Sequence, residues 1–389
     1  MKEIINTIQD QIQTFIDLRH RFHAYPELGL KEDRTSELIA ENLSNWGYEV
    51  TRGIAQTGLV ARMQRGTGTK RLGIRADMDA LPIRETTSLP YASQVDGVMH
   101  ACGHDGHMAM LLAGAWYLAF HGEFSGTLNL IFQPAEEDPG GAKMMIDEGL
   151  FDRFPCDAVF GMHNMPGIPQ GHLVFFDGPA TASSDDVTII FRGTGGHATA
   201  PQKTTDPLIA ASSVVLALQT LVSRNVDPRE MAVVSVGSFI SGTSNNVIPT
   251  EARLELTVRT FNREVRALLE RRVRDLVVAQ AESFGVSVDI DYRHGYPVMM
   301  TTPAETALAR SVGIDIVGTE RVVMHGEPVA GSEDFAYMLE QCPGSFLLIG
   351  NGHGEGACMV HNPDYDFDDK NIVTGAAYWS LLATRFLQS

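Results

Sequence analysis

Short apolar runs alternate with longer amphipathic stretches over the first 180 residues. The apolar runs have the length of buried strands and lie at 72–76 (LGIRA), 127–132 (TLNLIF) and 158–162 (AVFGM). The stretches at 106–120 and 141–150 have the pattern of helices. Strands that alternate with helices predict an α/β fold with a mixed, mostly parallel sheet and helices on both faces. The same pattern returns near the end of the chain, with an apolar run at 345–350 and a last helix at about 369–387.

The middle of the chain has a different rhythm. From residue 186 onward the pattern predicts strand, helix, strand, strand, helix and strand at 186–193, 206–223, 232–240, 251–260, 262–284 and 286–293. Asp206 followed by Pro207 is a typical helix start, because aspartate caps the first amides and proline needs none. The order βαββαβ predicts a small α+β domain of the ferredoxin-like kind. We therefore expect a discontinuous domain (1–180 and 296–389) interrupted by an inserted domain (181–295).

Composition narrows the class of ligand. The chain has 389 residues, 44% apolar content and a formal net charge of -18. Nucleic acids and anionic membranes attract basic surfaces, so we expect a small-molecule ligand, with neither nucleic acid nor membrane as a partner. The first 15 residues mix charged and apolar positions and show neither a signal peptide nor a membrane span. Four cysteines in so long a chain predict a reduced, cytoplasmic protein.

Polar residues follow directly after the predicted strands. Asp77 and Asp79 come after the first run, Glu136 and Glu137 after the second, and His163 after the third. Ligands of open α/β sheets bind at the carboxyl ends of the strands. These side chains are therefore expected to meet at one edge of the sheet.

The stretch MHACGHDGHM (99–108) adds softer metal ligands to this set. Cys102 and His104 are separated by one residue and can reach the same ion only from an irregular backbone. His107 is expected to support the start of the following helix instead. His361, in the segment MVHNPDYDF, resembles His163 in standing before an asparagine.

Counting the donors suggests two ions. The candidate ligands are Cys102, His104, Glu137, His163 and His361. A catalytic zinc usually takes about three protein ligands and keeps one position for water, so five donors suit two ions better than one. A shared thiolate or carboxylate could then bridge the ions, which leaves Glu136 as a general base.

A set of motifs, in order along nearly the whole chain, resembles a known enzyme family. The motifs are LRHRFHAYPELGLKE (18–32), GIRADMDALPI (73–83), HACGHDGHMAMLLAGA (100–115), IFQPAEE (131–137), GMHN (161–164), FRGTGGHATAP (191–201), NNVIPTEA (245–252), GSEDF (331–335) and HNPDYDFDD (361–369). They are similar to those of the metal-dependent amidohydrolases, the group of hippurate hydrolase, indole-acetyl-amino-acid hydrolases and N-acyl-amino-acid deacetylases. This resemblance implies cleavage of N-acyl amino acids by two divalent ions, zinc or often manganese, with nickel and cobalt also compatible with the donors. It implies the same five ligands and Glu136 as base.

The resemblance also implies roles for the inserted domain, as a lid and a dimerisation domain. Asn246 and Arg259 match positions that hold the substrate's carboxylate, although Arg259 alone would be equally acceptable as a solvent-facing strand residue. His197 matches a histidine that reaches the neighbouring subunit's metals in a homodimer. The other interpretation of His197 is a simple loop cap.

The more distant carboxypeptidases and aminoacylases show a different pattern. They carry His-x-Asp where this chain has Asp77-Met78-Asp79, and an aspartate bridge where it has Cys102. Asp79 is then expected to orient a ligand. The alternatives are an N-acetyl-diaminopimelate deacetylase or a small-peptide carboxypeptidase or dipeptidase. An inert metal-binding protein would lack a base such as Glu136, and a structural zinc protein would have clustered ligands.

Overall fold

The computed structural model describes residues 2–353 and 357–388, which form two compact units. Unit 1 contains Met1–Gly178, Met300–Glu327 and Tyr337–Ser389, and unit 2 contains Pro179–Met299 and Pro328–Ala336. The range 181–295 expected for the inserted domain does not include the second segment of unit 2. That segment carries no periodic pattern of its own, so the sequence gives no reason to separate it from its neighbours.

Unit 1 is built on a mixed sheet that the described residues form from eight strands. In sheet order these are β1 (Glu49–Ile54), β2 (Gly58–Arg65), β4 (Gly126–Gln133), β3 (Arg71–Asp77), β5 (Ala158–Gly167), β16 (Gly344–His353), β6 (Leu173–Phe175) and β15 (Val322–Val323). The central strands β4, β3, β5 and β16 run parallel, whereas β1, β2 and the β16–β6 pair are antiparallel. The predicted mixed, mostly parallel α/β fold is confirmed.

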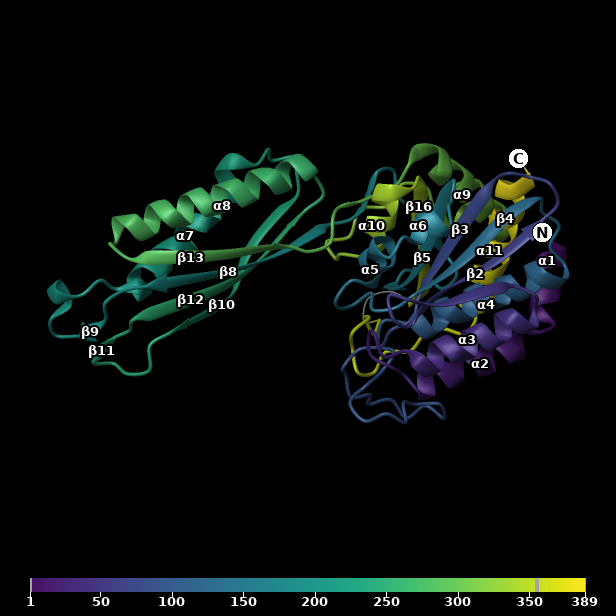
Figure 1. Cartoon of the computed structure of the whole chain (residues 1–389), viewed down its shortest axis with the longest axis horizontal. Coiled ribbons are helices and arrows are strands. Elements are labelled where there is room, and N and C mark those ends of the chain that lie inside the picture. Colours follow the sequence, from purple (N-terminus) through teal and green to yellow (C-terminus); the bar gives the residue numbers. More distant parts are fainter. Residues whose placement is uncertain (1, 354–356, 389) are drawn as a thin grey trace. The chain divides into compact units, whose positions relative to one another are not determined.

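The helices of unit 1 follow the predicted alternation, with one exception (Figure 1). They are α1 (Lys2–Gln9), α2 (Ile12–Ala24), α3 (Asp33–Asn45), α4 (His104–Phe120), α5 (Gly141–Asp147), α6 (Leu150–Arg153), α9 (Pro303–Val317), α10 (Phe335–Gln341, which begins in unit 2) and α11 (Asn371–Gln388). The helix predicted at 141–150 is confirmed as α5, but it ends earlier than predicted, at Asp147. Two short helices lie there, because Gly149 takes a φ of 82° that interrupts the α-helix.

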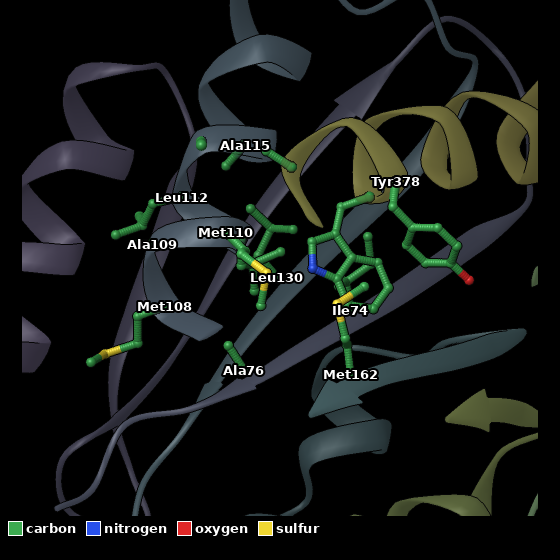
Figure 2. Packing of buried hydrophobic residues seen from close by; sticks show 14 of the residues in the cluster. Ile74, Ala76, Met108, Ala109, Met110, Leu112, Ala115, Leu130, Met162 and Tyr378 are labelled. Atoms are coloured by element: carbon green, nitrogen blue, oxygen red, sulfur yellow. The ribbon is translucent and has the colours of Figure 1, made fainter. Parts of the chain in front are cut away.

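Helix α4 lies at the centre of unit 1 and is apolar on nearly every side. It packs against α11, α2 and β3. Figure 2 shows Met110 and Ala115 of α4 in one cluster with Ile74 of β3 and Met162 of β5. Each fully buried side chain of this kind contributes about 1.5–3 kcal/mol relative to an exposed one. The first residue of α4, His104, is thereby held in a fixed place.

Unit 2 is a four-stranded antiparallel sheet with its helices packed on it (Figure 1). The strands in sheet order are β10 (Ala232–Ser241), β12 (Glu251–Thr260), β8 (Ser183–Arg192) and β13 (Ser287–His294), and the helices are α7 (Pro207–Asn225) and α8 (Arg263–Ser283). Smaller elements are β9 (Gly196–His197), β11 (Val247–Ile248), β7 (Pro179–Thr181) and β14 (Met299–Met300, which ends in unit 1). The order βαββαβ is that of the predicted ferredoxin-like domain. Asp206 caps α7 as predicted, accepting from the amides of Leu208 and Ile209.

Helix α7 is, within the described chain, the one helix long and apolar enough to cross a membrane by length and composition alone. Core helices often meet the same criterion. Ala210, Val214 and Leu218 of α7 are buried in the core of unit 2, which accounts for the apolar character of its inner face.

Candidate metal centre

The turn before α4 explains the spacing of Cys102 and His104. Gly103 lies between them with a left-handed φ of 87°. A Cβ at this position would lie 2.4 Å from Nδ2 of Asn164 and 2.5 Å from Oη of Tyr365, so only glycine fits. The short gap between the two donors therefore reflects a tight turn packed against the residue that follows His163.

All five predicted ligands and Glu136 lie in one cluster within unit 1. The side-chain donor atoms fall into groups whose members lie within 4.8 Å of one another: Cys102 with His104 and His163, Cys102 with Glu137 and His361, and His104 with Glu136 and Glu137. Sγ of Cys102 is 3.3 Å from Nε2 of His163. Nε2 of His361 is 3.0 Å from Oε1 of Glu137. Cys102 is thus common to two of the groups.

Backbone carbonyls orient two of the histidines. Nδ1 of His104 is 2.8 Å from the carbonyl oxygen of Asp79, and Nδ1 of His163 is 2.5 Å from the carbonyl oxygen of Asn164. A carbonyl can only accept, so in both rings Nδ1 carries the hydrogen. The Nε2 lone pair of each neutral ring is then available to a metal ion, an arrangement typical of metal-binding histidines.

His107 differs from these histidines because both of its ring nitrogens already have partners. Its Nδ1 donates to Oδ1 of Asp77 at 2.7 Å, and its Nε2 accepts from the backbone N–H of Asn164 at 2.9 Å. Asp77 in turn accepts from Arg75 at 2.7 Å. His107 therefore has a supporting position at the start of α4, as expected from the sequence.

Asp79 contacts two of the candidate ligands. Besides its carbonyl bond to His104, its Oδ2 accepts from the backbone N–H of Glu137 at 3.0 Å. Asp79 is 2% exposed and lies just after the end of β3. Through its carboxylate and its carbonyl, Asp79 thus ties the loop after β4 to the start of α4, which fits the predicted orienting role.

The buried charges of the cluster are predominantly negative. Burial lowers the pKa of His104, but the charges of Asp77 and Asp79 outweigh this effect and raise it to about 10. Burial, followed by the charges of Glu137 and Glu136, raises the pKa of the Cys102 thiol well above its ordinary value. Both groups therefore keep their protons in the absence of a cation. A divalent ion would replace these protons and neutralise the carboxylates.

The donor atoms fit such an ion. In the part of the chain that the structure describes, Nε2 of His104 and Oε1 of Glu137 are buried and have no hydrogen-bond partner. Oε1 of Glu137 lies 3.0 Å from Nε2 of the His361 ring, another candidate ligand. Unsatisfied buried polar atoms are costly, and a metal ion would satisfy both. Thiolate, imidazole and carboxylate together suit zinc and its neighbours in the transition series.

Two residues that adjoin or belong to the ligand set have strained backbones. Ala135, directly before Glu136, has a φ of 51°, and His361 has a φ of 65°. Residues other than glycine rarely adopt this region, and such strain concentrates at functional sites.

His163 departs from the position expected from the sequence, because β5 continues to Gly167 and the histidine lies within the strand rather than after it.

The predicted substrate residues lie in unit 2. His197 in β9 pairs with Val247 of β11, and the carbonyl of Asn246 accepts from the next amide, Ala198, at 3.0 Å, so His197 and Asn246 are neighbours. The His197 ring is exposed and interacts with Thr199.

Arg259 lies near the last residue of β12. Glu251, which pairs with Arg192 of β8, is at the opposite end of the strand. It is partly buried and donates to Oγ of Ser332 at 3.0 Å. Within unit 2 the structure therefore brings His197 and Asn246 together but not Arg259.

Asn164 and Glu32 were not identified as candidates from the sequence. Asn164 is fully buried, and its Nδ2 donates to the carbonyl of Cys102 at 2.7 Å while its Oδ1 accepts from Tyr365 at 2.5 Å. The repeated His-Asn pair at 163–164 and 361–362 was the one available signal for Asn164. Glu32 ends the motif at 18–32, but its residue type does not reveal its partners, the Ala135 amide and Oγ1 of Thr57.

A cluster of thiol, imidazole and carboxylate donors beside a buried glutamate, near the carboxyl ends of parallel strands, is typical of metal-dependent hydrolases. The model of peptidase family M20/M25/M40 matches residues 73–385. The hippurate hydrolase of Campylobacter jejuni is 41% identical over 385 residues, 99% of this chain and 100% of the relative. The N-acetyl-L-cysteine deacetylase of Bacillus subtilis is 36% identical over 386 residues, 99% of this chain and 90% of the relative.

A solved structure from the same family is also similar to this chain. The YXEP protein of Bacillus subtilis, described as a dinuclear metal binding peptidase from the M20 family, is 33% identical, with a TM-score of 0.84 over 97% of this chain and 99% of that one. The chain belongs to peptidase family M20/M25/M40, and it is a hydrolase that acts on amide bonds.

Proposed function

We propose that the protein hydrolyses the amide bond of N-acyl amino acids with two divalent metal ions. The observation that carries this proposal is the position of Cys102, which belongs to one donor group with His104 and His163 and to another with Glu137 and His361. Two groups that share a thiol suit two ions with a bridging ligand. Zinc and manganese are the favoured metals, and nickel and cobalt also suit these donors. The names of the relatives support an N-acyl amino acid as substrate.

In this mechanism Glu136 moves the proton. Bound divalent ions lower the pKa of water and polarise an amide carbonyl. Glu136 is 6% exposed, and its carboxylate lies within 4.8 Å of the donor atoms of His104 and Glu137. It accepts the proton of that water as the carbonyl carbon is attacked, and it then donates the proton to the leaving nitrogen. The products are a carboxylic acid and a free amino acid.

Neighbouring glutamates allow a matched test of these roles. Glu136→Gln should keep both metal ions and lose turnover by about 10²–10⁴-fold, the usual contribution of a general base. Glu137→Gln should instead lose bound metal, because an amide is a poorer ligand than a carboxylate. Metal analysis of both variants, paired with hydrolysis of N-acetyl, N-benzoyl and indole-acetyl amino acids, separates base from ligand. Near-normal turnover in Glu136→Gln would remove it from this role.

The proposal extends to recognition of the substrate's carboxylate by Asn246 and Arg259. An arginine fork can hold a carboxylate through two parallel hydrogen bonds. N-acyl amino acids should therefore be cleaved much faster than their carboxamides. Equal rates on the acid and the amide would contradict this part of the proposal.

We also propose a homodimer in which His197 stabilises the oxyanion in its partner's active site. Support comes from the exposed apolar surface of unit 2. Phe239 and Ile240 on the edge strand β10 are 41% and 62% exposed, and Leu216 on α7, which packs against β10, is 74% exposed. An unpaired edge strand beside an apolar helix face suits a two-fold contact.

Subunit complementation tests the role of His197. Glu136→Gln and His197→Ala proteins, each inactive alone, are mixed and allowed to exchange subunits. Action across the dimer gives each mixed dimer one intact site and therefore half of the wild-type activity per mixed dimer, so an equal and fully exchanged mixture rises toward about a quarter of the wild-type value. Action within one chain leaves every mixing ratio inactive. A monomer in sedimentation analysis would also overturn the proposal.

A cytoplasmic location completes the proposal. All four cysteines are free, which suits a reducing compartment.

A further inference from the structure

The turn that carries Glu136 and Glu137 is held on both sides of its first residue, Ala135. The carbonyl of Ala135 accepts from the amides of Gly140 and Gly141, at 3.1 and 2.8 Å. A Cβ at Gly141 would lie 1.8 Å from the carbonyl oxygen of Pro134, so the turn closes tightly on itself. The positive φ of Ala135 is thus maintained by its surroundings rather than by its own preference.

A buried carboxylate from another part of the chain holds the other side of Ala135. Glu32, the residue before α3, is fully buried, and its Oε1 accepts from the backbone N–H of Ala135 at 2.9 Å. Its Oε2 accepts from Oγ1 of Thr57 at 2.5 Å. Both carboxylate oxygens therefore have donors, as a buried acid requires.

The segment before Glu32 also packs closely against this turn. A Cβ at Gly29 would lie 2.6 Å from the carbonyl oxygen of Asp138 and 3.0 Å from Cβ of Ala135. The segment 29–32 therefore contacts the turn at two points on either side of the glutamate pair. Neither contact involves a candidate metal ligand directly.

We propose that Glu32 is a positioning residue for Glu136: by holding the Ala135 amide it fixes the strained turn that presents the base to the substrate. The inference rests on the proposed function, because it takes Glu136 as the base. Rotation of the peptide at residue 135 would move the Cα of the next residue, and small displacements of a reacting group are costly in rate. The expected loss is therefore in kcat rather than in KM or metal binding.

Glu27 provides a matched control in the same segment. Its carboxylate also accepts backbone amides, those of Thr35 at 2.8 Å and Arg34 at 3.2 Å, but these belong to the start of α3. Glu32→Leu and Glu27→Leu thus each remove a carboxylate that binds main-chain N–H groups. Only the first should affect the turn at Ala135.

The experiment compares metal-loaded variants in kinetics and in amide hydrogen exchange. Glu32→Leu should lower kcat by on the order of tenfold to hundredfold, with KM and metal content nearly unchanged. Peptides that contain Ala135 should exchange faster in this variant. Glu32→Gln keeps an acceptor of the same shape and should restore most of the turnover, and Glu27→Leu should show wild-type kcat and exchange at Ala135. Wild-type kcat in Glu32→Leu, or a lower kcat without faster exchange, overturns the proposal.

A second variant covers the case in which Glu32→Leu does not fold. Gly29→Ala leaves Glu32 intact but pushes on Ala135 and Asp138, so the same fall in kcat and faster exchange are expected. An unchanged kcat in folded Gly29→Ala would contradict the proposal. The exchange result does not depend on Glu136 being the base. If Glu136→Gln keeps its turnover while Glu32→Leu speeds exchange, Glu136 is not the base. The role of Glu32 in holding the Ala135 amide is then still supported.

Discussion

The buried position of Glu32 makes the stability of unit 1 depend on pH in a predictable way. Burial raises the pKa of Glu32 from 4.5 to about 7, against the opposing hydrogen bonds from Thr57 and Ala135. The folded state therefore holds this proton more tightly than the unfolded state. The contribution of Glu32 to stability is complete below pH 4.5 and is lost as the pH rises through 7.

The magnitude follows from the two pKa values. One pKa unit corresponds to about 1.4 kcal/mol, so ionisation of Glu32 in the folded protein costs about 3 kcal/mol. Between about pH 5.5 and 8.5, the contribution of Glu32 to the free energy of unfolding falls by about 2 kcal/mol. Glu32→Gln has no such titration. Relative to the wild type, this variant should become more stable by about 2 kcal/mol over that range, while all other titrations cancel in the comparison.

Urea unfolding followed by tryptophan fluorescence measures this difference on metal-free protein. All three tryptophans, Trp46, Trp116 and Trp379, lie in unit 1 together with Glu32. Thr57→Val removes a hydrogen bond that lowers the pKa of Glu32, so the pH-dependent loss should move to higher pH in that variant. A difference between Glu32→Gln and wild type that stays constant from pH 5.5 to 8.5 would refute the reasoning.

Three further predictions concern the cluster itself. Gly103→Ala should lower the free energy of unfolding by about 1–2 kcal/mol through the left-handed backbone alone, and it should weaken metal binding because its Cβ would displace Asn164. Unfolding curves and metal titration measure the two effects, and an unchanged metal affinity would contradict the second. Asp79→Ala removes the side-chain acceptor of the Glu137 amide and should lower metal affinity by about 10–100-fold, the usual effect of losing a partner that orients ligands. Competition with a chromophoric chelator measures the affinity. Protein with metal at about 100–1,000 times its dissociation constant should be more stable in unit 1, by about 3–4 kcal/mol, than protein from which a chelator has removed the metal. Identical unfolding midpoints with and without metal would count against a metal site.

The sequence predicted the central strands and the candidate ligands because both have strong local patterns. Runs such as 127–132 are apolar throughout, and β4 is buried along its whole length. The antiparallel pair β1 and β2 at the sheet edge was not identified, because only Ile54 of β1 is buried and the apolar run of β2 is short, at 59–61. The break between α5 and α6 depended on the backbone conformation of one glycine, Gly149, which composition does not reveal.

Main-chain groups orient the side chains of the metal centre. For this reason the residue types in the sequence did not identify all the residues that support the centre. Nδ1 of His104 and of His163 each bind a backbone carbonyl, and the Glu32 carboxylate binds a backbone amide. Every residue carries these groups, so no side-chain pattern marks which carbonyl or amide the fold will use. A motif can therefore reveal which atoms bind metal while leaving unmarked the residues that aim them. For that reason Glu32, buried and remote in sequence from every ligand, is a better test of how the centre is built than any residue that would bind metal directly.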